Sequence, residues 1–213
     1  MNLPELRKNY AMAGLKRMDL KGDPFTQFKL WMEQALESKI IEPNAMTLST
    51  TSAEGYPSSR TVLLKGLDQS GFSFFTNYSS RKAQDLEANP HAALTFLWKE
   101  LERQVCIRGT VKRTSRKISK EYFHSRPYGS QIGAWVSETQ SGEVSDRATL
   151  EKRETELLIK FPETEEVPLP DFWGGYELAP KHIEFWQGRP GRIHDRLCYQ
   201  RDGDDWMITR LSP

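Results

Sequence analysis

Residues 45–76 have the sequence AMTLSTTSAEGYPSSRTVLLKGLDQSGFSFFT, in which β-prone runs alternate with turn residues. The runs 45–52, 58–67 and 72–76 are rich in Thr, Ser, Leu and Phe, and a short segment containing glycine separates each run from the next. Runs of this length joined by short turns form neighbouring antiparallel strands. The segment therefore predicts an antiparallel meander.

The rest of the chain is predicted to extend this sheet and to add helices around it. Further strands are expected at 91–98, 103–113, 172–179, 182–187, 192–200 and 205–211. Helices are expected at 24–39, 80–88, 115–126 and 145–160. Strands first, helices in the middle and strands again indicate an α+β protein, mainly antiparallel β, in which a barrel carries peripheral helices.

Length, charge and cysteine content disfavour several classes of protein. The 213 residues suffice for one core, so we expect a flexible N-terminal arm at 1–20 and a single domain at 21–213. Thirty basic and 29 acidic residues leave a net charge of +1, which disfavours a nucleic-acid or membrane-surface protein. Cys106 and Cys198 lie far apart, outside any CxxC or Cys/His cluster, which argues against a disulfide framework or zinc site and favours the cytoplasm.

Several familiar motifs are missing from the sequence. It contains no GxGxxG, GxxxxGKS/T, HExxH or GxSxG pattern, which disfavours nicotinamide-fold, P-loop, zinc-protease and serine-hydrolase sites. No apolar run approaches the roughly 20 residues that a membrane helix needs. Any chemistry must therefore come from other clusters of polar residues, of which three stand out.

The first cluster is Arg81 and Lys82, which begin a predicted helix directly after Ser79 and Ser80. The helix dipole disfavours cations at this end of a helix. Free backbone N–H groups, serine hydroxyls and two cations together would, however, bind a phosphate. The alternative is that both basic side chains point into water.

The second cluster is Arg192-Ile193-His194-Asp195-Arg196. Strand periodicity places Arg192, His194 and Arg196 on one face. Such a row would line an extended anionic or aromatic ligand. The alternative is a solvated edge strand, whose charges prevent aggregation.

The third cluster is Tyr122, Arg126 and Ser130. Its phenol, guanidinium and hydroxyl groups could together hold one phosphate. The alternative is that Tyr122 and Arg126 only contact each other on a helix surface. In addition, Arg60 and Lys65 bound an apolar run, and either side chain could reach water. Several cationic clusters with hydroxyls and aromatics predict a flat phosphorylated ligand, or two of them, held by a cofactor enzyme.

These clusters and the motifs around them resemble the pyridoxine 5′-phosphate oxidase family. The first motifs are Arg60-Thr-Val-Leu-Leu-Lys65, Phe75-Thr76, Ser80-Arg81-Lys82, Glu102-Arg103-Gln104, Tyr122-Phe-His-Ser-Arg126-Pro127 and Ser130-Gln-Ile-Gly-Ala-Trp135. The C-terminal motifs are Pro168-Leu-Pro170, Phe172-Trp-Gly-Gly175, Glu184-Phe-Trp-Gln-Gly188, Arg192-Ile-His-Asp-Arg196 and Arg210-Leu211. The resemblance runs from about Leu6 to Pro213.

The resemblance implies an FMN-binding split β-barrel that forms a homodimer through a C-terminal dimerisation segment at 168–213, with each site built from both chains. It assigns FMN contacts to Arg60, Thr61, Val62, Leu63, Leu64, Lys65, Phe75, Thr76, Arg81, Lys82, Gln104, Gln140, Ser141, Trp186 and Arg196. It assigns substrate contacts to Lys65, Tyr122, Arg126, Ser130, Arg192, Ile193 and His194. Arg192 and His194 are expected over the substrate ring, and the catalytic set is completed by the arm residues Arg7 and Tyr10, which would close the pocket.

The implied activity is oxidation of pyridoxine 5′-phosphate or pyridoxamine 5′-phosphate to pyridoxal 5′-phosphate, with O₂ as electron acceptor and H₂O₂ as by-product. The alternatives are a flavin reductase of the same fold that uses a nicotinamide donor, a carrier of FMN or pyridoxal phosphate, and a nucleic-acid module. Oxidation of pyridoxine 5′-phosphate without added nicotinamide would distinguish the oxidase from the reductase. A carrier would produce no peroxide when substrate is added. The low net charge disfavours the nucleic-acid module.

Overall fold

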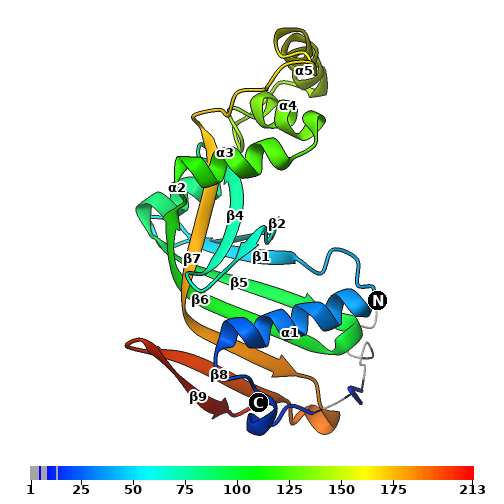
Figure 1. Cartoon of the computed structure of the whole chain (residues 1–213), viewed down its shortest axis with the longest axis vertical. Coiled ribbons are helices and arrows are strands. Elements are labelled where there is room, and N and C mark those ends of the chain that lie inside the picture. The colour runs from blue at the N-terminus through cyan, green and yellow to red at the C-terminus, as the bar shows by residue number, and fades with distance from the viewer. Residues whose placement is uncertain (1–4, 6–8, 13) are drawn as a thin grey trace.

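The computed structural model describes residues 5, 9–12 and 14–213. In these residues, one antiparallel sheet of nine strands curls into an open half-barrel (Figure 1). The strands are β1 (Ala45–Thr51), β2 (Pro57–Leu63), β3 (Gly66–Leu67), β4 (Phe72–Asn77), β5 (His91–Trp98), β6 (Arg103–Arg113), β7 (Trp173–Gln187), β8 (Asp195–Asp202) and β9 (Asp205–Leu211). The helices are α1 (Pro24–Glu37), α2 (Arg81–Ala88), α3 (Arg116–Ser125), α4 (Tyr128–Val136) and α5 (Arg147–Lys160).

The strand order is β2-β1-β5-β6-β7-β4-β3, with β8 and β9 added beside β7. One edge of β7 pairs with β6 along most of its length. The other edge pairs first with β4, over 173–178, and then with β8, over 182–187. The sheet therefore divides at the middle of β7 into a part that contains β4 and a part that contains β8.

The sequence predicted two strands on either side of Pro180, and this prediction was wrong because β7 continues through the proline. Opposite it the register of β6 shifts, since Arg108 pairs with His182 whereas Gly109 pairs with Pro180. Proline has no N–H to donate to a neighbouring strand, and a bulge is a place where a sheet tolerates it. The chain thus passes Pro180 without leaving the sheet.

The main core lies between α1 and the sheet. As predicted, Asp23 caps this helix by accepting a hydrogen bond from the backbone N–H of Thr26 at 2.9 Å, and a proline takes the first helical position. Phe28 of α1 is fully buried, with its ring centroid 5.1 Å from that of Phe72 on β4 and 4.9 Å from that of Phe96 on β5. Helix α1 therefore ties together strands that are distant in the sheet order.

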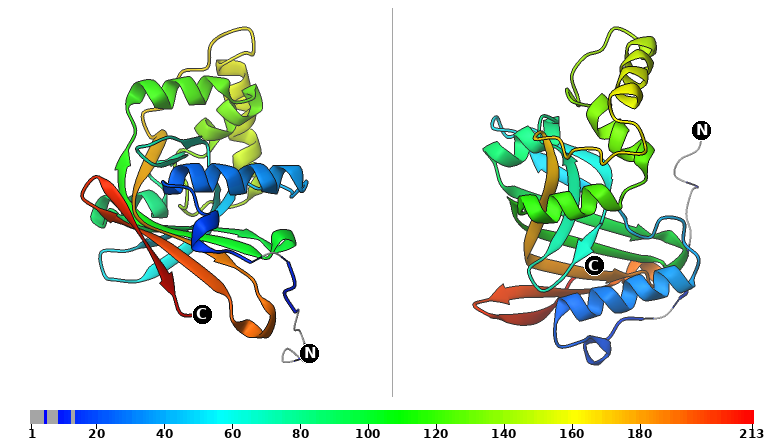
Figure 2. Two further views of the ribbon diagram at one scale, coloured as in Figure 1. Left: turned by 60° about the horizontal axis from the view of Figure 1, so that its bottom comes forward. Right: turned by 45° about the horizontal axis from the view of Figure 1, so that its top comes forward.

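Helices α3, α4 and α5 stand beside the sheet around a second, smaller core (Figure 2). This core contains Phe123, Ile132, Leu157 and Trp173, and the last of these is the first residue of β7. The sequence predicted α3 and α5 but not α4. Within the described ranges, no helix is both long and apolar enough to span a membrane.

Candidate active site

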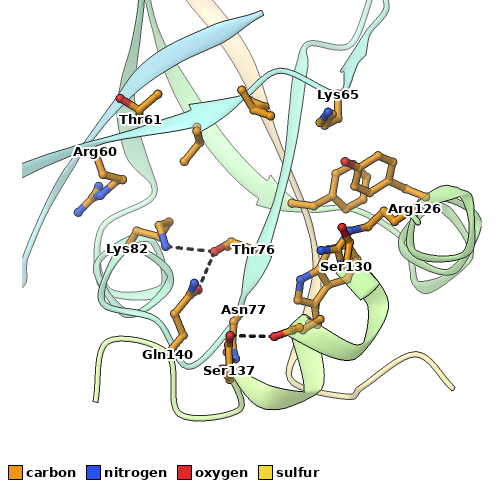
Figure 3. Close-up of a pocket in the computed structure, with 17 residues that line it drawn as sticks. Arg60, Thr61, Lys65, Thr76, Asn77, Lys82, Arg126, Ser130, Ser137 and Gln140 are labelled. Carbon is orange, nitrogen blue, oxygen red and sulfur yellow. Dashed lines mark hydrogen bonds between the residues drawn. The ribbon is translucent and has the colours of Figure 1, made fainter. Parts of the chain in front are cut away.

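A cavity of about 450 Å³ opens where β2 and β4 meet helices α2, α3 and α4 (Figure 3). Most of the predicted cofactor and phosphate contacts lie in its wall, namely Arg60, Thr61, Val62, Leu63, Lys65, Phe75, Thr76, Lys82, Tyr122, Arg126, Ser130 and Gln140. The wall also contains residues to which the sequence gave no role, namely Asn77, Gly133, Ala134, Ser137 and Trp173. Helical spacing could have found two of them, because Gly133 and Ala134 follow Ser130 by one turn.

One end of the cavity is positively charged. Lys82, in the first turn of α2, donates a hydrogen bond from Nζ to Thr76 Oγ1 at 3.2 Å, and the Thr76 hydroxyl donates in turn to Gln140 Oε1 at 3.3 Å (Figure 3). Burial, together with the charge of Arg60, lowers the pKa of Lys82. An ammonium group held partly out of water beside a second cation favours an anionic ligand.

Arg60 is fixed by the protein behind this end of the cavity. Its guanidinium donates to Thr50 Oγ1 at 2.7 Å and to Ser58 Oγ at 2.6 Å, and it lies 3.8 Å from the buried carboxylate of Asp85. Burial lowers the pKa of Arg60, and the Asp85 charge opposes that shift. Because several of its donors are already occupied, Arg60 acts as a fixed source of positive charge.

The loop after α4 is tied to the turn that precedes α2. Asn77 Nδ2 donates a hydrogen bond to the carbonyl oxygen of Ser137 at 2.5 Å, and the backbone N–H of Arg81 donates to Ser141 Oγ at 3.3 Å. Arg81 and Ser141 line an adjoining hollow of about 300 Å³, and Gln140 lines both this hollow and the cavity. These bonds bring the predicted loop residues to the helix N-terminus at which the sequence predicted an anion.

The other end of the cavity holds an incompletely paired arginine. Among the described residues, Arg126 Nη1 is the one buried side-chain nitrogen or oxygen with no hydrogen-bond partner. The guanidinium lies 4.8 Å from the centroid of the Trp173 ring, and burial lowers the pKa of Arg126. Ser130 and Lys65 line the same end (Figure 3). A buried donor without a partner is costly, so an anion such as phosphate fits this position.

A stack of aromatic rings forms the wall beside Arg126. Phe75 lies against Tyr122 with ring centroids 4.0 Å apart and an angle of 26° between the planes. It also stacks on Trp173, with centroids 5.6 Å apart and an angle of 15°. The phenol of Tyr122 and the Arg126 guanidinium are therefore both held by packing on flat rings, next to a cavity with cations at each end.

Some predicted FMN contacts lie away from this cavity. Leu64 packs against the main core. Gln104, Trp186 and Arg196 occupy paired positions on three neighbouring strands, with Gln104 opposite Trp186 and Trp186 opposite Arg196. Arg196 also forms a two-point ion pair with Glu184, at N–O distances of 2.7 and 2.9 Å. We call Gln104, Trp186 and Arg196 the strand group, and it is separate from the cavity described above.

The structure corrects the predicted row of Arg192, His194 and Arg196 on one strand face. Pro190–Arg192 forms a 3-10 turn, Arg192 has a left-handed backbone with φ of 66°, and β8 begins only at Asp195. Proline followed by glycine favours a turn over a strand, which is why the predicted strand starts late. The three side chains therefore do not project from one regular strand.

His194 packs against the ring of Trp186 and against the arm. Its ring centroid lies 4.6 Å from that of Trp186 and 5.7 Å from that of Tyr10. His194 Nδ1 accepts a hydrogen bond from the backbone N–H of Arg189 at 3.1 Å, so the neutral ring carries its proton on Nε2. The remaining predicted site residues are Ile193, which is 73% exposed, and Arg7, which lies outside the described residues.

Two sequence families match this chain. The model of the family described as "Pyridoxamine 5′-phosphate oxidase" matches residues 32–159, and the model described as "Pyridoxine 5′-phosphate oxidase C-terminal dimerisation region" matches residues 173–213. The first match contains most of the cavity wall and Gln104. The second contains Trp186 and Arg196 of the strand group.

Named relatives and solved structures agree with these matches. The chain is 55% identical over 212 residues to the pyridoxine/pyridoxamine 5′-phosphate oxidase of Paraburkholderia phymatum, with 99% of each chain covered. It is 55% identical over 216 residues to the pyridoxine/pyridoxamine 5′-phosphate oxidase of Crocosphaera subtropica, with 100% of each chain covered.

Among solved structures, PhzG from Burkholderia lata 383 in complex with tetrahydrophenazine-1-carboxylic acid has a TM-score of 0.88 and 31% identity, over 95% of this chain and 99% of that chain. A pyridoxamine 5′-phosphate oxidase-related, FMN binding protein from Nostoc punctiforme PCC 73102 has a TM-score of 0.72 at 14% identity, over 91% of this chain and 100% of that chain. The split-barrel fold predicted from the sequence is thereby confirmed.

Proposed function

Since the chain belongs to the pyridoxine 5′-phosphate oxidase family, we propose that it oxidises pyridoxine 5′-phosphate or pyridoxamine 5′-phosphate to pyridoxal 5′-phosphate. FMN is the cofactor in this proposal, O₂ accepts the electrons and hydrogen peroxide is released. Relatives that are 55% identical over their full length are named for this pair of substrates.

The observation that carries the proposal is the unpaired Nη1 of Arg126. This donor lies in a cavity that Lys65, Ser130 and Tyr122 also line, so two cations and two hydroxyls are available to one phosphate. A phosphate would satisfy the unpaired donor through a charge-assisted hydrogen bond. The same cavity has a second cationic end at Lys82, which suits a ligand pair with one phosphate each.

FMN fits the Lys82 end of the cavity. The segment 60–65, Thr76 and Gln140 would hold the cofactor, and Lys82 with the nearby Arg81 would bind its phosphate. Bound FMN supplies a hydride acceptor for the substrate carbon. The protein contributes placement and electrostatics: the fixed charge of Arg60 and the half-buried ammonium of Lys82 stabilise anionic groups without rearrangement during the reaction.

The strand group is assigned to the same cofactor by family resemblance, although it lies outside the cavity of its own chain. A homodimer in which the strand group of one subunit completes the cavity of the other accounts for both observations. The match of residues 173–213 to a dimerisation region supports this arrangement. Symmetry would then give two equivalent sites.

In the completed site, Arg192 and His194 orient the substrate ring, with Tyr10 beside them. His194 has its Nδ1 occupied by the backbone, which leaves the Nε2–H directed elsewhere as a hydrogen-bond donor. A donor of this kind can hold an oxygen of the substrate and keep a proton at a defined atom. The contacts of His194 with Tyr10 and Trp186 fix the orientation of its ring.

The cytoplasm is the proposed location, and the cysteines support it. Both cysteines are free, and each is aligned with Glu184 of β7, from the neighbouring strands β6 and β8. Two strand spacings amount to about 9–10 Å, whereas a disulfide needs Cα atoms less than about 7 Å apart. Cys106 and Cys198 therefore cannot join, and nothing in this pair requires an oxidising compartment.

The direct test is an oxidation assay on the purified protein. We expect a yellow preparation with a flavin spectrum that produces peroxide and an aldehyde when pyridoxine 5′-phosphate is added in air without nicotinamide. Unphosphorylated pyridoxine serves as the matched control, and it should react poorly because Arg126 would stay unpaired. Absence of peroxide with both phosphorylated substrates, from a flavin-loaded sample, contradicts the proposal.

A second candidate function follows from the likeness to PhzG, whose structure contains tetrahydrophenazine-1-carboxylic acid. A substrate of that class carries a carboxylate in place of a phosphate. The two candidate functions are distinguished by comparing kcat/KM for the two substrates. The value should be larger for the phosphorylated ring, because the Arg126 end of the cavity favours a phosphate. A larger value for a dihydro- or tetrahydrophenazine carboxylate than for pyridoxine 5′-phosphate would reverse the order of the candidates.

A further inference from the structure

Glu102 belongs to a motif that the sequence analysis singled out but to which the proposed function gives no role. It lies in the turn between β5 and β6, directly after the 3-10 turn Lys99–Leu101, and it is only 4% exposed. Its backbone is left-handed, with φ of 54°, which side chains other than glycine rarely adopt. A buried carboxylate at a strained position indicates that the side chain has a specific task.

The carboxylate of Glu102 holds the N-terminal arm. Its Oε2 accepts hydrogen bonds from the backbone N–H groups of Ala11 at 3.0 Å and Met12 at 3.1 Å, some 90 residues away in sequence. An ionised carboxylate that receives two successive backbone donors forms strong, charge-assisted hydrogen bonds. The acceptor comes from the rigid sheet and the donors come from an otherwise irregular segment, so Glu102 fixes the path of the arm.

A second carboxylate holds the arm a few residues later. The backbone N–H of Leu15 donates to Asp195 Oδ2 at 3.0 Å, and Arg210 Nη2 donates to the carbonyl oxygen of Leu15 at 3.1 Å. The Leu15 side chain is buried in the main core. The arm is therefore attached to the sheet at two places, through Ala11 and Met12 to Glu102 and through Leu15 to Asp195.

This attachment places Tyr10 against two residues of the proposed active site. The Tyr10 ring centroid lies 5.8 Å from that of Trp186 and 5.7 Å from that of His194, both in edge-to-face geometry. Gly188 permits the close approach, because a Cβ atom there would lie 2.8 Å from Tyr10 Cγ and 3.1 Å from Glu102 Cβ. The lack of a side chain at Gly188 therefore leaves room for the Tyr10 ring on the sheet.

We infer that Glu102 is a positioning residue: its buried carboxylate holds the arm before substrate arrives, so that Tyr10 already packs on His194 and Trp186. The role of this wall in substrate binding rests on the proposed function, whereas the anchoring of the arm does not. A held arm spares the substrate the cost of ordering it. Loss of the anchor should therefore raise KM more than it lowers kcat.

The test compares Glu102→Ala and Glu102→Gln with Glu100→Ala in the flavin-loaded, full-length protein. Glu100 is an exposed glutamate in the preceding turn and serves as the matched control. Hydrogen exchange measured by mass spectrometry reports on peptides that span Ala11 and Met12. In Glu102→Ala we expect these amides to exchange at least about tenfold faster, with strand β6 still protected. Glu102→Gln retains an acceptor oxygen and should lie between Glu102→Ala and the wild type.

The kinetic arm of the test uses the same variants. For Glu102→Ala we expect KM for pyridoxine 5′-phosphate to rise about tenfold with kcat changed less than about threefold, whereas Glu100→Ala should match the wild type. Gly188→Ala supplies a second variant that keeps the carboxylate of Glu102. Its methyl group would crowd Tyr10 and, less closely, Glu102 Cβ, and it should raise KM in the same direction.

The outcomes separate the anchor from the proposed function. Unchanged exchange at Ala11 and Met12 in Glu102→Ala, in a protein that oxidises pyridoxine 5′-phosphate, overturns the anchor alone. Faster exchange throughout β6 as well as the arm also overturns it, since Glu102 would then support the fold in general. Faster exchange confined to the arm, in a wild-type protein that does not oxidise either substrate, supports the anchor and contradicts the proposed function.

Discussion

Arg126 has its guanidinium packed on the Trp173 ring, part of its donor capacity unused and an open cavity before it. The sequence pointed to this residue because Tyr122 and Arg126 were predicted to share a helix face just before Pro127, whereas in the structure α3 ends at Ser125 and Arg126 follows it with an extended backbone. It could not show that one nitrogen lacks a partner, since this depends on how β7 brings Trp173 under the guanidinium. Long-range packing of this kind leaves little trace in local sequence.

Replacing Arg126 with Leu should weaken substrate binding selectively. The apolar side chain can still pack on Trp173, but the donor available to a phosphate is lost, which corresponds to about 1.5–3 kcal/mol or a roughly 10- to 150-fold increase in KM. Flavin absorbance after gel filtration should be unchanged. Arg147→Leu on the exposed face of α5 is the control. An unchanged KM in Arg126→Leu would remove the basis for placing the substrate phosphate here.

For the segment around Arg192, in contrast to Arg126, the prediction from the sequence was wrong. Alternation of charged and apolar residues favoured a strand, yet the structure has a 3-10 turn at Pro190–Arg192. Pro190 and Gly191 carried the signal for the turn, and the alternation that follows them obscured it. The contact of His194 with Tyr10 joins residues from the two ends of the chain, so no local pattern could predict it.

Helix α4 is the α-helix that the sequence missed, for a clear physical reason. It has nine residues, two of which are Gly129 and Gly133, and glycine disfavours helix by about 1 kcal/mol relative to alanine. Tertiary contacts stabilise it instead, since Ile132 and Ala134 are buried. The longer helices α1 and α5 carry capping residues and were predicted well.

A larger side chain at Gly133 of α4 should change the free energy of unfolding and the affinity for ligand in opposite directions. A Cβ atom at Gly133 would meet no atom within 4 Å, and this residue lines the cavity. Gly133→Leu should raise the free energy of unfolding, since replacing a helical glycine gains about 0.5–1 kcal/mol, but it should weaken ligand binding by occupying the cavity. Gly129→Leu is the control, because Gly129 also has open space but does not line the cavity. Thermal melts and FMN titrations check both parts, and equal FMN affinities in the two variants would contradict the prediction.

The described part of the arm should detach in acid. Burial raises the pKa of Asp195, but the hydrogen bond from Leu15 and the charges of Arg210 and Arg189 outweigh this and hold it below its ordinary value. A carboxyl whose pKa is lower in the folded state stabilises the structure above its unfolded pKa and loses this contribution as pH falls through the folded value. We therefore expect Leu15 to stay protected from hydrogen exchange at pH 5–7 and to lose protection only as pH falls below the ordinary pKa of an aspartate side chain, toward the lowered pKa of Asp195.

Asp195→Asn is the control for this pH effect. The amide cannot titrate, so the variant should exchange faster at Leu15 at neutral pH and show little further change between pH 5 and pH 3, after correction for intrinsic exchange. A wild-type arm whose exchange at Leu15 depends on pH no more than that of Asp195→Asn, over the whole acid range in which the sheet stays folded, would contradict the assigned role of Asp195.

At the scale of the whole molecule, the sequence predicted an antiparallel sheet with peripheral helices, and resemblance supplied the split-barrel fold. The strand order was beyond local patterns, because β4 and β7 pair across about 100 residues of intervening chain. The continuity of β7 was missed for the same reason. The proline that suggested two strands is accommodated only through the matching register shift in β6.

Mixing two inactive variants should test the shared site. We expect Lys82→Ala, which alters the cavity, and Arg196→Ala, which alters the strand group, each to bind FMN poorly and to show little activity. In mixed dimers one site carries both changes and the other carries neither, so random subunit exchange should restore about a quarter of wild-type activity. Lys82→Ala mixed with itself is the control. Failure of activity to recover despite mass-spectrometric proof of mixed dimers would argue that each chain completes its own site.

The continuous strand β7 has a consequence for how this architecture diversifies. Its first half pairs with β4, beside the cavity, and its second half pairs with β8, which bears part of the strand group. A chain that ended or changed course after β7 could therefore retain the pocket while presenting a different surface to its neighbour. Descendants of one ancestral barrel could in this way keep a common prosthetic group and acquire new chemistries by exchanging only the final hairpin.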